Sequence, residues 1–299
     1  MGKTLAKKVM FPPPGKYIVA VSGGVDSVVL LDLLATHGRY DLCVAHFDHG
    51  MRTDSKLDRE FVAALAKQYG LRFAYAEGKL GLKATEEQAR QARYRYLQQL
   101  AQELQARIVT AHHQDDVLET AIFNAGRGAD RLGLTPLHLN QQVIRPLLKL
   151  SKSELVDYAK KQQLKWQEDP TNADVTIARN FIRQRALPQV DRTTLAERIE
   201  QLAQLNQNLN RRWEDWLSRH TDITDDSMIW RRSDLVSLRP DELADLLRYS
   251  LRRLNTNLEA AQVNRLAHFC IAAQPGKQLA LGGNLEAKCI GSTIRLAKS

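Results

Sequence analysis

The run from Ser22 to Ser27, SGGVDS, carries the residue types that hold a phosphate group in proteins. Gly23 and Gly24 let the backbone approach a ligand without a Cβ in the way, and consecutive N–H groups at a helix start supply positive potential. Ser22 and Ser27 add hydroxyl donors, and Asp26 could hold a metal ion such as Mg²⁺ beside the phosphate. The sequence contains no GxxxxGKS or GxxxxGKT motif, so a lysine-bearing nucleotide loop is excluded. A tight turn with Ser and Asp as helix caps explains the same residues.

A second polar run, TAHHQDDVLET at 110–120, combines histidines and carboxylates. Asp116 and Glu119 stand three residues apart, so a helix presents them on one face. Two such carboxylates could hold the ammonium group of a free amino acid or a metal ion, and one could take the proton of a nucleophilic amine. An acidic helix N-terminus explains Asp115 and Asp116 almost as well. His112 and Asp115 are candidates for shaping the site rather than for chemistry.

Other polar side chains recur at the ends of the apolar runs. His46 and Asp48 follow a β-favouring run and could orient the adenine or ribose of a nucleotide or bind a metal; a hydrogen-bonded structural role is equally expected. Several arginines could bind the phosphates or base edges of a nucleic acid, although each could also be an ordinary surface charge. They are Arg90 and Arg93 in TEEQARQARYRYL, Arg127 in GRGADRLGL, and the group Arg179, Arg183 and Arg185.

These polar runs are separated by alternating strand and helix patterns. Short β-favouring runs occupy 17–21, 41–47, 71–75 and 107–111, and stretches of helix length occupy 26–37, 54–69 and 86–105. The alternation predicts an α/β fold, a parallel sheet with helices on both faces. In such a fold SGGVDS is a strand-to-helix turn at the carboxyl edge of the sheet, where ligands bind. Ser151 and Glu154 form a capping box, which predicts one further helix.

The pattern changes after Pro188, and the length of 299 residues suits two domains. The stretch TLAERIEQLAQLNQNLNRRWEDWLSRH has Leu or Ile at 195, 199, 202, 205 and 209 on one helical stripe. The last stretch, QLALGGNLEAKCIGSTIRLAKS, has turn residues that predict one or two hairpins. We therefore expect an α/β domain over 1–190 and a smaller, mainly helical domain over 191–299.

Composition narrows the class of protein. The net charge is +9, and most of the surplus lies in the first 190 residues, which favours a polyanionic partner such as nucleic acid. No apolar run is long enough for a membrane span, and the N-terminus lacks the pattern of a secretory signal, so we expect a cytoplasmic protein with no membrane partner. The three cysteines form no CxxC pair and are expected to be buried.

The loop resembles a known phosphate-binding element. The pattern Ser-x-Gly-Gly-x-Asp-Ser after a first strand is similar to the pyrophosphate-binding loop of the PP-loop ATPases. That resemblance implies that ATP is cleaved to AMP and pyrophosphate through an adenylated intermediate. It assigns Ser22, Gly23, Gly24, Val25, Asp26 and Ser27 to ATP binding.

Later motifs resemble one PP-loop family, the tRNA(Ile)-lysidine synthases. AHFDHGMR at 45–52 is similar to its HxDHGxR motif, TEEQARQARYRYL at 85–97 to its ExxARxxRY motif, and AHHQDDVLET to its AHHxDDQxET motif. Further matches, GRGADRLGL, IRPLL, EDPTN and ARNFIR, follow in order up to residue 183. Val117 stands where the family usually has Gln, so the contact of that side chain is lost. The last third of the chain has no specific motif.

The family resemblance implies a reaction and its partners. The family joins free L-lysine to C2 of the wobble cytidine, position 34, of a CAU-anticodon tRNA(Ile), with ATP and Mg²⁺. It implies catalytic roles for Asp26, Asp116 and Glu119, lysine binding by Asp116 and Glu119, and ATP contacts from His46 and Asp48. It implies tRNA contacts from Arg90, Arg93, Arg127, Arg179 and Arg183 and from the second domain. Some members carry an additional C-terminal module, which we do not expect in this chain because of its length.

Two other functions stay open at this point. A PP-loop tRNA thiolase shares the loop but commonly brings cysteine pairs, which Cys43, Cys270 and Cys289 do not form. A non-catalytic nucleotide-binding or tRNA-binding protein needs only the loop and the basic charge, although intact Asp26, Asp116 and Glu119 argue against it. The sequence leaves open whether the chain forms a homodimer.

Overall fold

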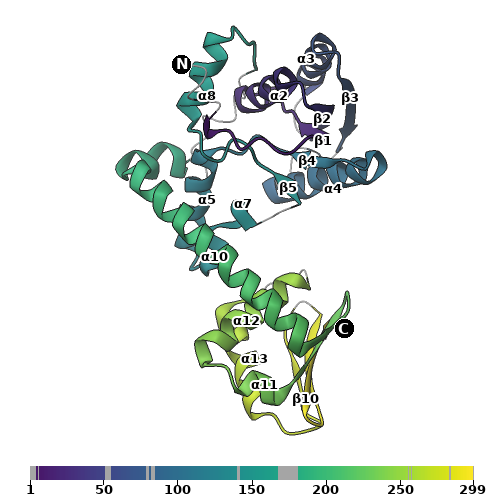
Figure 1. Cartoon of the computed structure of the whole chain (residues 1–299), viewed down its shortest axis with the longest axis vertical. Helices are drawn as coiled ribbons and strands as arrows, with labels where there is room; N and C mark the ends of the chain where they lie inside the picture. Colours follow the sequence, from purple (N-terminus) through teal and green to yellow (C-terminus); the bar gives the residue numbers. More distant parts are fainter. Residues whose placement is uncertain are drawn as a thin grey trace. The chain divides into compact units, whose positions relative to one another are not determined.

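The computed structural model of the chain describes residues 5, 7–50, 55–78, 81, 85–139, 142–167, 181–254, 256, 258–282 and 284–298. These residues form two compact units, 1–203 and 204–299. The elements of the first unit are shown in Figure 1. Its strands are β1 (Gly15–Ala20), β2 (Tyr40–Asp48), β3 (Arg72–Glu77), β4 (Arg107–Val109) and β5 (Val143–Ile144). Its helices are α2 (Val25–His37), α3 (Ser55–Gln68), α4 (Glu86–Leu104), α5 (Gln114–Gly126), α6 (Arg131–Leu134), α7 (Pro136–Leu139), α8 (Lys152–Lys161), η2 (Ile182–Ala186), η3 (Leu187–Gln189) and the first part of α10 (Arg192–His220).

The first unit is built on the expected parallel sheet. Its strand order is β3-β2-β1-β4-β5, and every neighbouring pair is parallel. The chain adds β2 and β3 on one side of β1 and then returns to place β4 on the other side. The loops after β1 and β4 therefore leave the sheet side by side at a topological switch point, which is where open α/β sheets bind ligands.

Both faces of the sheet are buried, which explains the continuous apolar runs of its strands. In β1, Tyr17 and Val19 belong to the core that includes α2, α3 and α8, whereas Ile18 belongs to the core that includes α4. The same alternation in β2 sends Val44 to the first core and Cys43 to the second. Figure 1 shows α2 and α3 on one side of the sheet and α4 on the other. The predicted α/β architecture is confirmed.

Helix α8 is fixed firmly to α2. Leu155 and Ala159 of α8 pack with α2 in one core, and the buried carboxylate of Asp32 accepts hydrogen bonds from Tyr158 and Tyr69 at 2.7 Å each. The expected capping box is present, because Ser151 accepts from the Glu154 backbone and Glu154 accepts from the Ser151 backbone. The first residue of α8 therefore has a well-defined position relative to the start of α2.

The second unit combines helices with a sheet. After α10, its elements are β6 (Thr221–Ile223), β7 (Ser227–Arg231), α11 (Arg232–Val236), α12 (Pro240–Arg253), α13 (Ala260–Ala272), β8 (Gln278–Ala280), β9 (Leu285–Ile290) and β10 (Thr293–Lys298). The strands form an antiparallel sheet in the order β6-β7-β10-β9-β8. The expected terminal hairpin is β9–β10. Strands β6 and β7 were not foreseen, and β7 contributes the fully buried Trp230 to the core.

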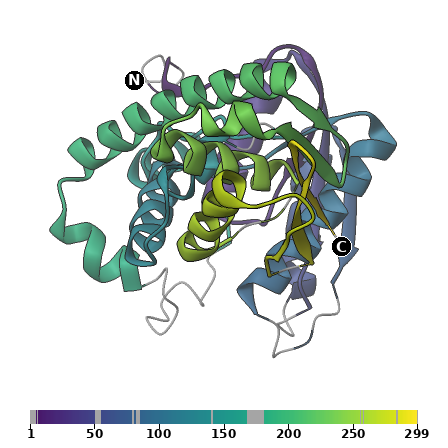
Figure 2. The ribbon, with the colours of Figure 1, turned by 90° about the horizontal axis from the view of Figure 1, so that it is seen from below.

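The division between the units falls inside α10, which Figure 2 shows as one continuous helix. We expected the boundary after residue 190. The first turns of α10 instead belong to the first unit, because Ile199 is buried in the core that contains Val117 and Leu118 of α5, and Leu195 packs against the same core. The first turns of α10 therefore pack against the helix that carries Asp116, whereas Leu205, which we expected on the same apolar stripe, is exposed.

Two further expectations concern cysteines and membranes. Cys43, Cys270 and Cys289 are buried and free, as expected from their spacing. Among the described helices, none has both the length and the apolar character needed to cross a membrane.

Candidate functional site

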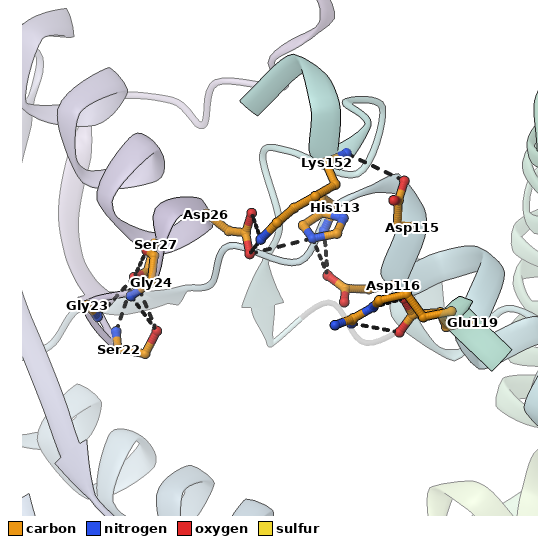
Figure 3. Close-up of polar contacts among 11 residues, drawn as sticks. Ser22, Gly23, Gly24, Asp26, Ser27, His113, Asp115, Asp116, Glu119 and Lys152 are labelled. Carbon is orange, nitrogen blue, oxygen red and sulfur yellow. Dashed lines mark hydrogen bonds and ion pairs between the residues drawn. The ribbon is translucent and has the colours of Figure 1, made fainter. Parts of the chain in front are cut away.

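The loop between β1 and α2 is closed by the Ser27 hydroxyl. Ser27 Oγ accepts hydrogen bonds from the N–H groups of Ser22 (3.2 Å) and Gly23 (3.3 Å) and donates to the carbonyl of Gly24 (2.9 Å). Gly23 has φ +100°, a conformation that favours glycine. The Ser27 side chain, which we expected to face a ligand, therefore holds the loop in shape (Figure 3).

The start of α2 provides further backbone donors beside this loop. Gly24 is the N-cap residue, and no side chain caps the helix. The N–H groups of Val25, Asp26 and Ser27 lie in the first helical turn, where a helix offers no carbonyl partner of its own. Such a turn attracts an anion through these donors and the helix dipole. The loop and helix start are suited to a phosphate group.

Asp26, in the first turn of α2, is held by two cations from other elements. Its carboxylate accepts hydrogen bonds from Lys152 Nζ at 2.8 Å (Oδ1) and 2.6 Å (Oδ2), and His113 Nε2 lies 3.6 Å from Oδ2. Lys152 is the first residue of α8, and His113 is the N-cap of α5. Burial opposes ionisation of Asp26, but the hydrogen bond and charge of His113 and the charge of Lys152 outweigh it, so the pKa is lowered.

His113 connects the two polar runs of the sequence. Its Nε2 is 3.6 Å from Asp26 Oδ2 and 3.6 Å from Asp116 Oδ2, and its backbone N–H donates to Asp116 Oδ2 at 2.9 Å. Burial favours the neutral imidazole, but the two carboxylates outweigh this effect and raise the pKa of His113. Figure 3 shows the resulting row Lys152, Asp26, His113 and Asp116. The carboxylates of the two runs therefore face one imidazole.

Glu119 lies one turn further along α5 and is paired with Arg183. Arg183 Nε donates to Oε1 at 2.6 Å and Nη2 to Oε2 at 3.0 Å, and the Glu119 side chain is only 3% exposed. Burial raises the pKa of Glu119, while Arg183 acts against this shift. We assigned Glu119 to lysine and Arg183 to tRNA from the sequence; the structure joins them to each other. Asp116 is the more accessible carboxylate, with its side chain 26% exposed.

His46 and Asp48 make local contacts at the end of β2. The buried His46 ring places Nδ1 2.9 Å from the Val21 carbonyl, which ties β2 to the start of the loop. Asp48 Oδ1 accepts a hydrogen bond from the Gly50 N–H at 2.8 Å, and the backbone carbonyl of Asp48 accepts one from the Gly78 N–H at 2.7 Å. These contacts favour the structural alternative for His46 and Asp48.

Arg90 and Arg93 gather around one aromatic ring. The Arg90 guanidinium lies 4.9 Å and the Arg93 guanidinium 5.5 Å from the centre of the Tyr94 ring. Burial lowers the pKa of His112 well below its usual value, and the nearby charges of Arg145, Arg93 and Arg90 lower it further. Arg145 is buried and donates to the carbonyls of Leu137 and Val143. This basic cluster lies beside the strand end that leads into α5.

The remaining arginines have different surroundings. Arg127 is exposed at the C-terminal end of α5, with its guanidinium 5.5 Å from the centre of the Phe123 ring. Arg185 is exposed on η2. Arg179, like Arg52 and the EDPTN motif, lies outside the described residues.

Val117 is part of a core rather than of the site. It is buried against Ile182, Leu187 and Ile199, so an apolar side chain suits this position. This packing accounts for the departure from the Gln that the resemblance led us to expect.

Sequence reasoning missed Lys152, Arg192 and the role of His113. Arg192 pairs with Asp115 at 2.5 Å, and the Lys152 backbone N–H lies 3.5 Å from Asp115 Oδ1. One signal for Lys152 was present, because it directly follows the capping residue Ser151. Its contact with Asp26 depends on packing across 126 residues of chain and has no local signature.

No group of three or more His, Cys, Asp or Glu side chains that could hold a metal ion occurs among the described residues. Mg²⁺ usually keeps several waters and is bound by one or two carboxylates together with substrate phosphates. Asp26, a carboxylate in the first turn of α2 beside the phosphate-binding loop, fits that mode of binding. The residues present therefore fit a Mg²⁺ ion that is held jointly with a nucleotide.

The family model of the PP-loop domain matches residues 3–190. The chain belongs to the PP-loop domain family. The matched region contains the first unit up to the end of η3, including the SGGVDS loop and α5.

Curated relatives named tRNA(Ile)-lysidine synthase extend this similarity. The protein from Solibacter usitatus is 40% identical over 185 residues, covering 60% of this chain and 42% of the relative. The one from Geobacter sulfurreducens is 37% identical over 242 residues, covering 74% and 51%. The one from Thermus thermophilus is 34% identical over 302 residues, covering 95% and 57%. The chain thus spans about half the length of the curated relatives it matches.

Among solved structures, the chain is similar to the U34-tRNA thiolase NcsA from Methanococcus maripaludis. The TM-score is 0.52 at 19% identity, and the match covers 68% of this chain and 76% of the thiolase. At this identity the similarity shows the fold alone.

Proposed function

We propose that this PP-loop protein is an ATP-dependent ligase that joins L-lysine to C2 of the wobble cytidine of CAU-anticodon tRNA(Ile). The relatives at 34–40% identity carry the name of this activity. The reaction proceeds through a cytidine adenylated at the C2 oxygen, releases pyrophosphate, and then exchanges AMP for the lysine ε-amine. The product is lysidine, and the enzyme acts in the cytoplasm.

The single observation that carries the proposal is the pair of distances to His113 Nε2. Asp26 of the phosphate-binding loop and Asp116 of α5 each lie 3.6 Å from this atom. The nucleotide end and the amine end of the site are therefore neighbours. Activation of the cytidine and attack by lysine can then occur in one pocket, without transfer of an intermediate between distant sites.

At the nucleotide end, the first turn of α2 binds the ATP pyrophosphate through the N–H groups of Val25, Asp26 and Ser27. Ser22, Gly23 and Gly24 let the loop backbone lie close to the phosphates. Asp26 would hold Mg²⁺, which would supply positive charge beside the leaving pyrophosphate. His46 supports the start of the loop from the adjoining strand through its contact with the Val21 carbonyl.

At the amine end, Asp116 binds the ammonium group of free lysine and takes a proton from the attacking ε-amine. In the described part of the chain, its Oδ2 faces His113, and Oδ1 accepts no hydrogen bond. Glu119 contributes from a buried position, and its ion pair with Arg183 favours the ionised form. We therefore assign proton transfer to Asp116 and a positioning role to Glu119.

The tRNA backbone is bound by arginines around the site. Arg90 and Arg93, stacked near Tyr94, suit phosphate or base contacts close to the wobble nucleotide. We propose further tRNA contacts from Arg127 and Arg179, and Arg183 adds its exposed edge while it pairs with Glu119. The second unit contributes further tRNA contacts.

The decisive experiment incubates the protein with ATP, labelled lysine and unmodified tRNA(Ile) that carries CAU. Incorporation of label into the tRNA with stoichiometric AMP release supports the proposal. A tRNA with GAU in place of CAU is the matched control and should take up no label. Binding of ATP and tRNA without AMP release would instead indicate a non-catalytic binding protein.

A single substitution tests the proposed role of Asp116 in lysine binding. Asp116→Asn should raise the KM for lysine about tenfold or more, because a charge-assisted contact is lost, and leave the ATP affinity within twofold. Unchanged lysine kinetics in this variant would refute the role of Asp116.

A further inference from the structure

Lys152 has a rigid base and an accessible charge. Its backbone is fixed by the capping box of α8 and by the packing of α8 on α2, and Gln114 N–H donates to the neighbouring Leu150 carbonyl at 2.8 Å. Its side chain is nevertheless 42% exposed, and its ammonium group covers both oxygens of Asp26. An ion pair that only joined α8 to α2 would not need to lie beside a phosphate-binding loop.

The ammonium group and a metal ion would compete for the same atoms. Asp26 is the carboxylate that suits Mg²⁺ in this site, and both of its oxygens are engaged by Lys152. A Mg²⁺ ion that arrives with a nucleotide has to share or displace that contact. The lysine stem consists of four flexible methylene groups, so the displaced ammonium can turn to the nearest new anion, which is the pyrophosphate.

The loop itself supplies no cationic side chain. Other phosphate loops place a lysine within the loop so that it reaches the β- and γ-phosphates, but SGGVDS has none. Lys152 brings a positive charge to the same place from α8, which lies 126 residues further along the chain. The second cation close to Asp26, His113, is largely buried and is shared with Asp116, so it is less able to follow a ligand.

We propose that Lys152 is a ligand of the nucleotide pyrophosphate, and that its ammonium group is exchanged between Asp26 and the β- and γ-phosphates. This inference rests on the proposed ATP site. It adds a binding residue outside the loop and couples metal binding at Asp26 to phosphate binding at Lys152.

Equilibrium binding separates this role from a structural one. Lys152→Met keeps the apolar stem and removes the charge. With Mg²⁺ present, it should bind ATP and inorganic pyrophosphate about tenfold or more weakly, and AMP, which has no pyrophosphate, within twofold of wild type. Without nucleotide, its affinity for Mn²⁺, measured by electron paramagnetic resonance, should rise. Lys149→Met is the matched control, because Lys149 pairs with Glu200 instead, and it should change none of these affinities.

Equal losses for AMP and ATP, or no loss for pyrophosphate, would overturn the proposal. A second measurement is made on the wild-type protein, so it does not depend on whether Lys152→Met folds. In protein labelled with ¹³C at the lysine ε-carbons, the signal that is missing from Lys152→Arg should shift on addition of pyrophosphate but not of AMP. A signal that pyrophosphate leaves unmoved would also overturn it. If wild type itself binds no ATP, the proposed function fails as well, whereas equal ATP binding by wild type and Lys152→Met removes only the role of Lys152.

Discussion

Arg183 holds Glu119 through two parallel hydrogen bonds, Nε to Oε1 at 2.6 Å and Nη2 to Oε2 at 3.0 Å. The pair connects η2 to α5, so the segment that follows the PP-loop sheet is attached to the helix that carries Asp116. Because Glu119 is almost fully buried, its charge depends on this partner. The pair therefore links the helix that carries Asp116 to the position of η2.

Removal of Arg183 should destabilise the fold. Breaking a fully buried pair costs about 3–5 kcal/mol, but the Arg183 side chain is 42% exposed, so water reduces the expected cost of Arg183→Ala to about 1–3 kcal/mol. Adding Glu119→Ala should recover part of this loss, and a double-mutant cycle by urea unfolding gives the coupling energy. Arg185→Ala, on the exposed side of η2, is the control. An Arg183 variant no less stable than this control would show that the pair is unimportant.

The two loop glycines should differ in what their replacement changes. Gly23→Ala forces a side chain into φ +100° and should cost about 1–3 kcal/mol of stability. Gly24 has φ −70°, and an added Cβ would meet only Ser22 Oγ at 3.6 Å. The free energy of unfolding of Gly24→Ala should therefore lie within about 0.5 kcal/mol of the wild-type value. The substitution should still weaken ATP binding about tenfold, because the Cβ keeps the phosphate from the backbone. Thermal unfolding and ATP titration of both variants test this; equal loss of stability would contradict it.

The elements of the first unit were predictable because their signals are local. Alternating apolar runs indicated β1 to β4, and the glycines of SGGVDS indicated the turn after β1. The Ser151 and Glu154 capping box likewise predicted the start of α8. The order of the strands placed SGGVDS and the AHHQDD run at one edge, which follows from a parallel sheet with a switch point.

The pairing of charges was not predictable in the same way. Glu119 and Arg183 are 64 residues apart, and Asp26 and Lys152 are 126 apart. The sequence suggested ligand contacts for Asp26, Glu119 and Arg183 and none for Lys152, but the structure provides internal partners for both carboxylates. Strands β6 and β7 were not predicted, and the periodic α10 pattern gave no sign that Ile199 and Leu217 belong to different units.

Stability should fall as the pH is lowered from 7 to 5 because of His112. Burial, followed by the charges of Arg145, Arg93 and Arg90, lowers the pKa of His112 in the folded protein. The unfolded chain therefore binds the proton first, and the contribution present above about pH 6.5 is lost as the pH falls toward the folded-state pKa. His113, whose pKa is raised, acts in the opposite direction at higher pH.

The variant His112→Asn isolates this effect. It removes one titrating group, so the slope of unfolding free energy against pH between 5 and 6.5 should become less positive by up to about 1.4 kcal/mol per pH unit. Urea unfolding at a series of pH values measures the slope. An identical slope in His112→Asn and wild type would contradict the assigned shift.

The first turns of α10 should stabilise the first unit and the later turns should not. Ile199 is buried in the core beneath α5, so Ile199→Ala should lower the free energy of unfolding by about 2–5 kcal/mol. Leu205 lies on the same helix but is 59% exposed, so Leu205→Ala should lower it by about 0.5 kcal/mol or less. Val117 and Leu118 share that core with Ile199 and flank Asp116 on α5. Ile199→Ala should therefore also shift Asp116 and raise the KM for lysine.

A chain of residues 1–203 should accordingly melt at a higher temperature than one of residues 1–190, since only the longer chain keeps the first turns of α10 that cover this core. Equal melting temperatures would place the boundary after residue 190, as the sequence pattern suggested.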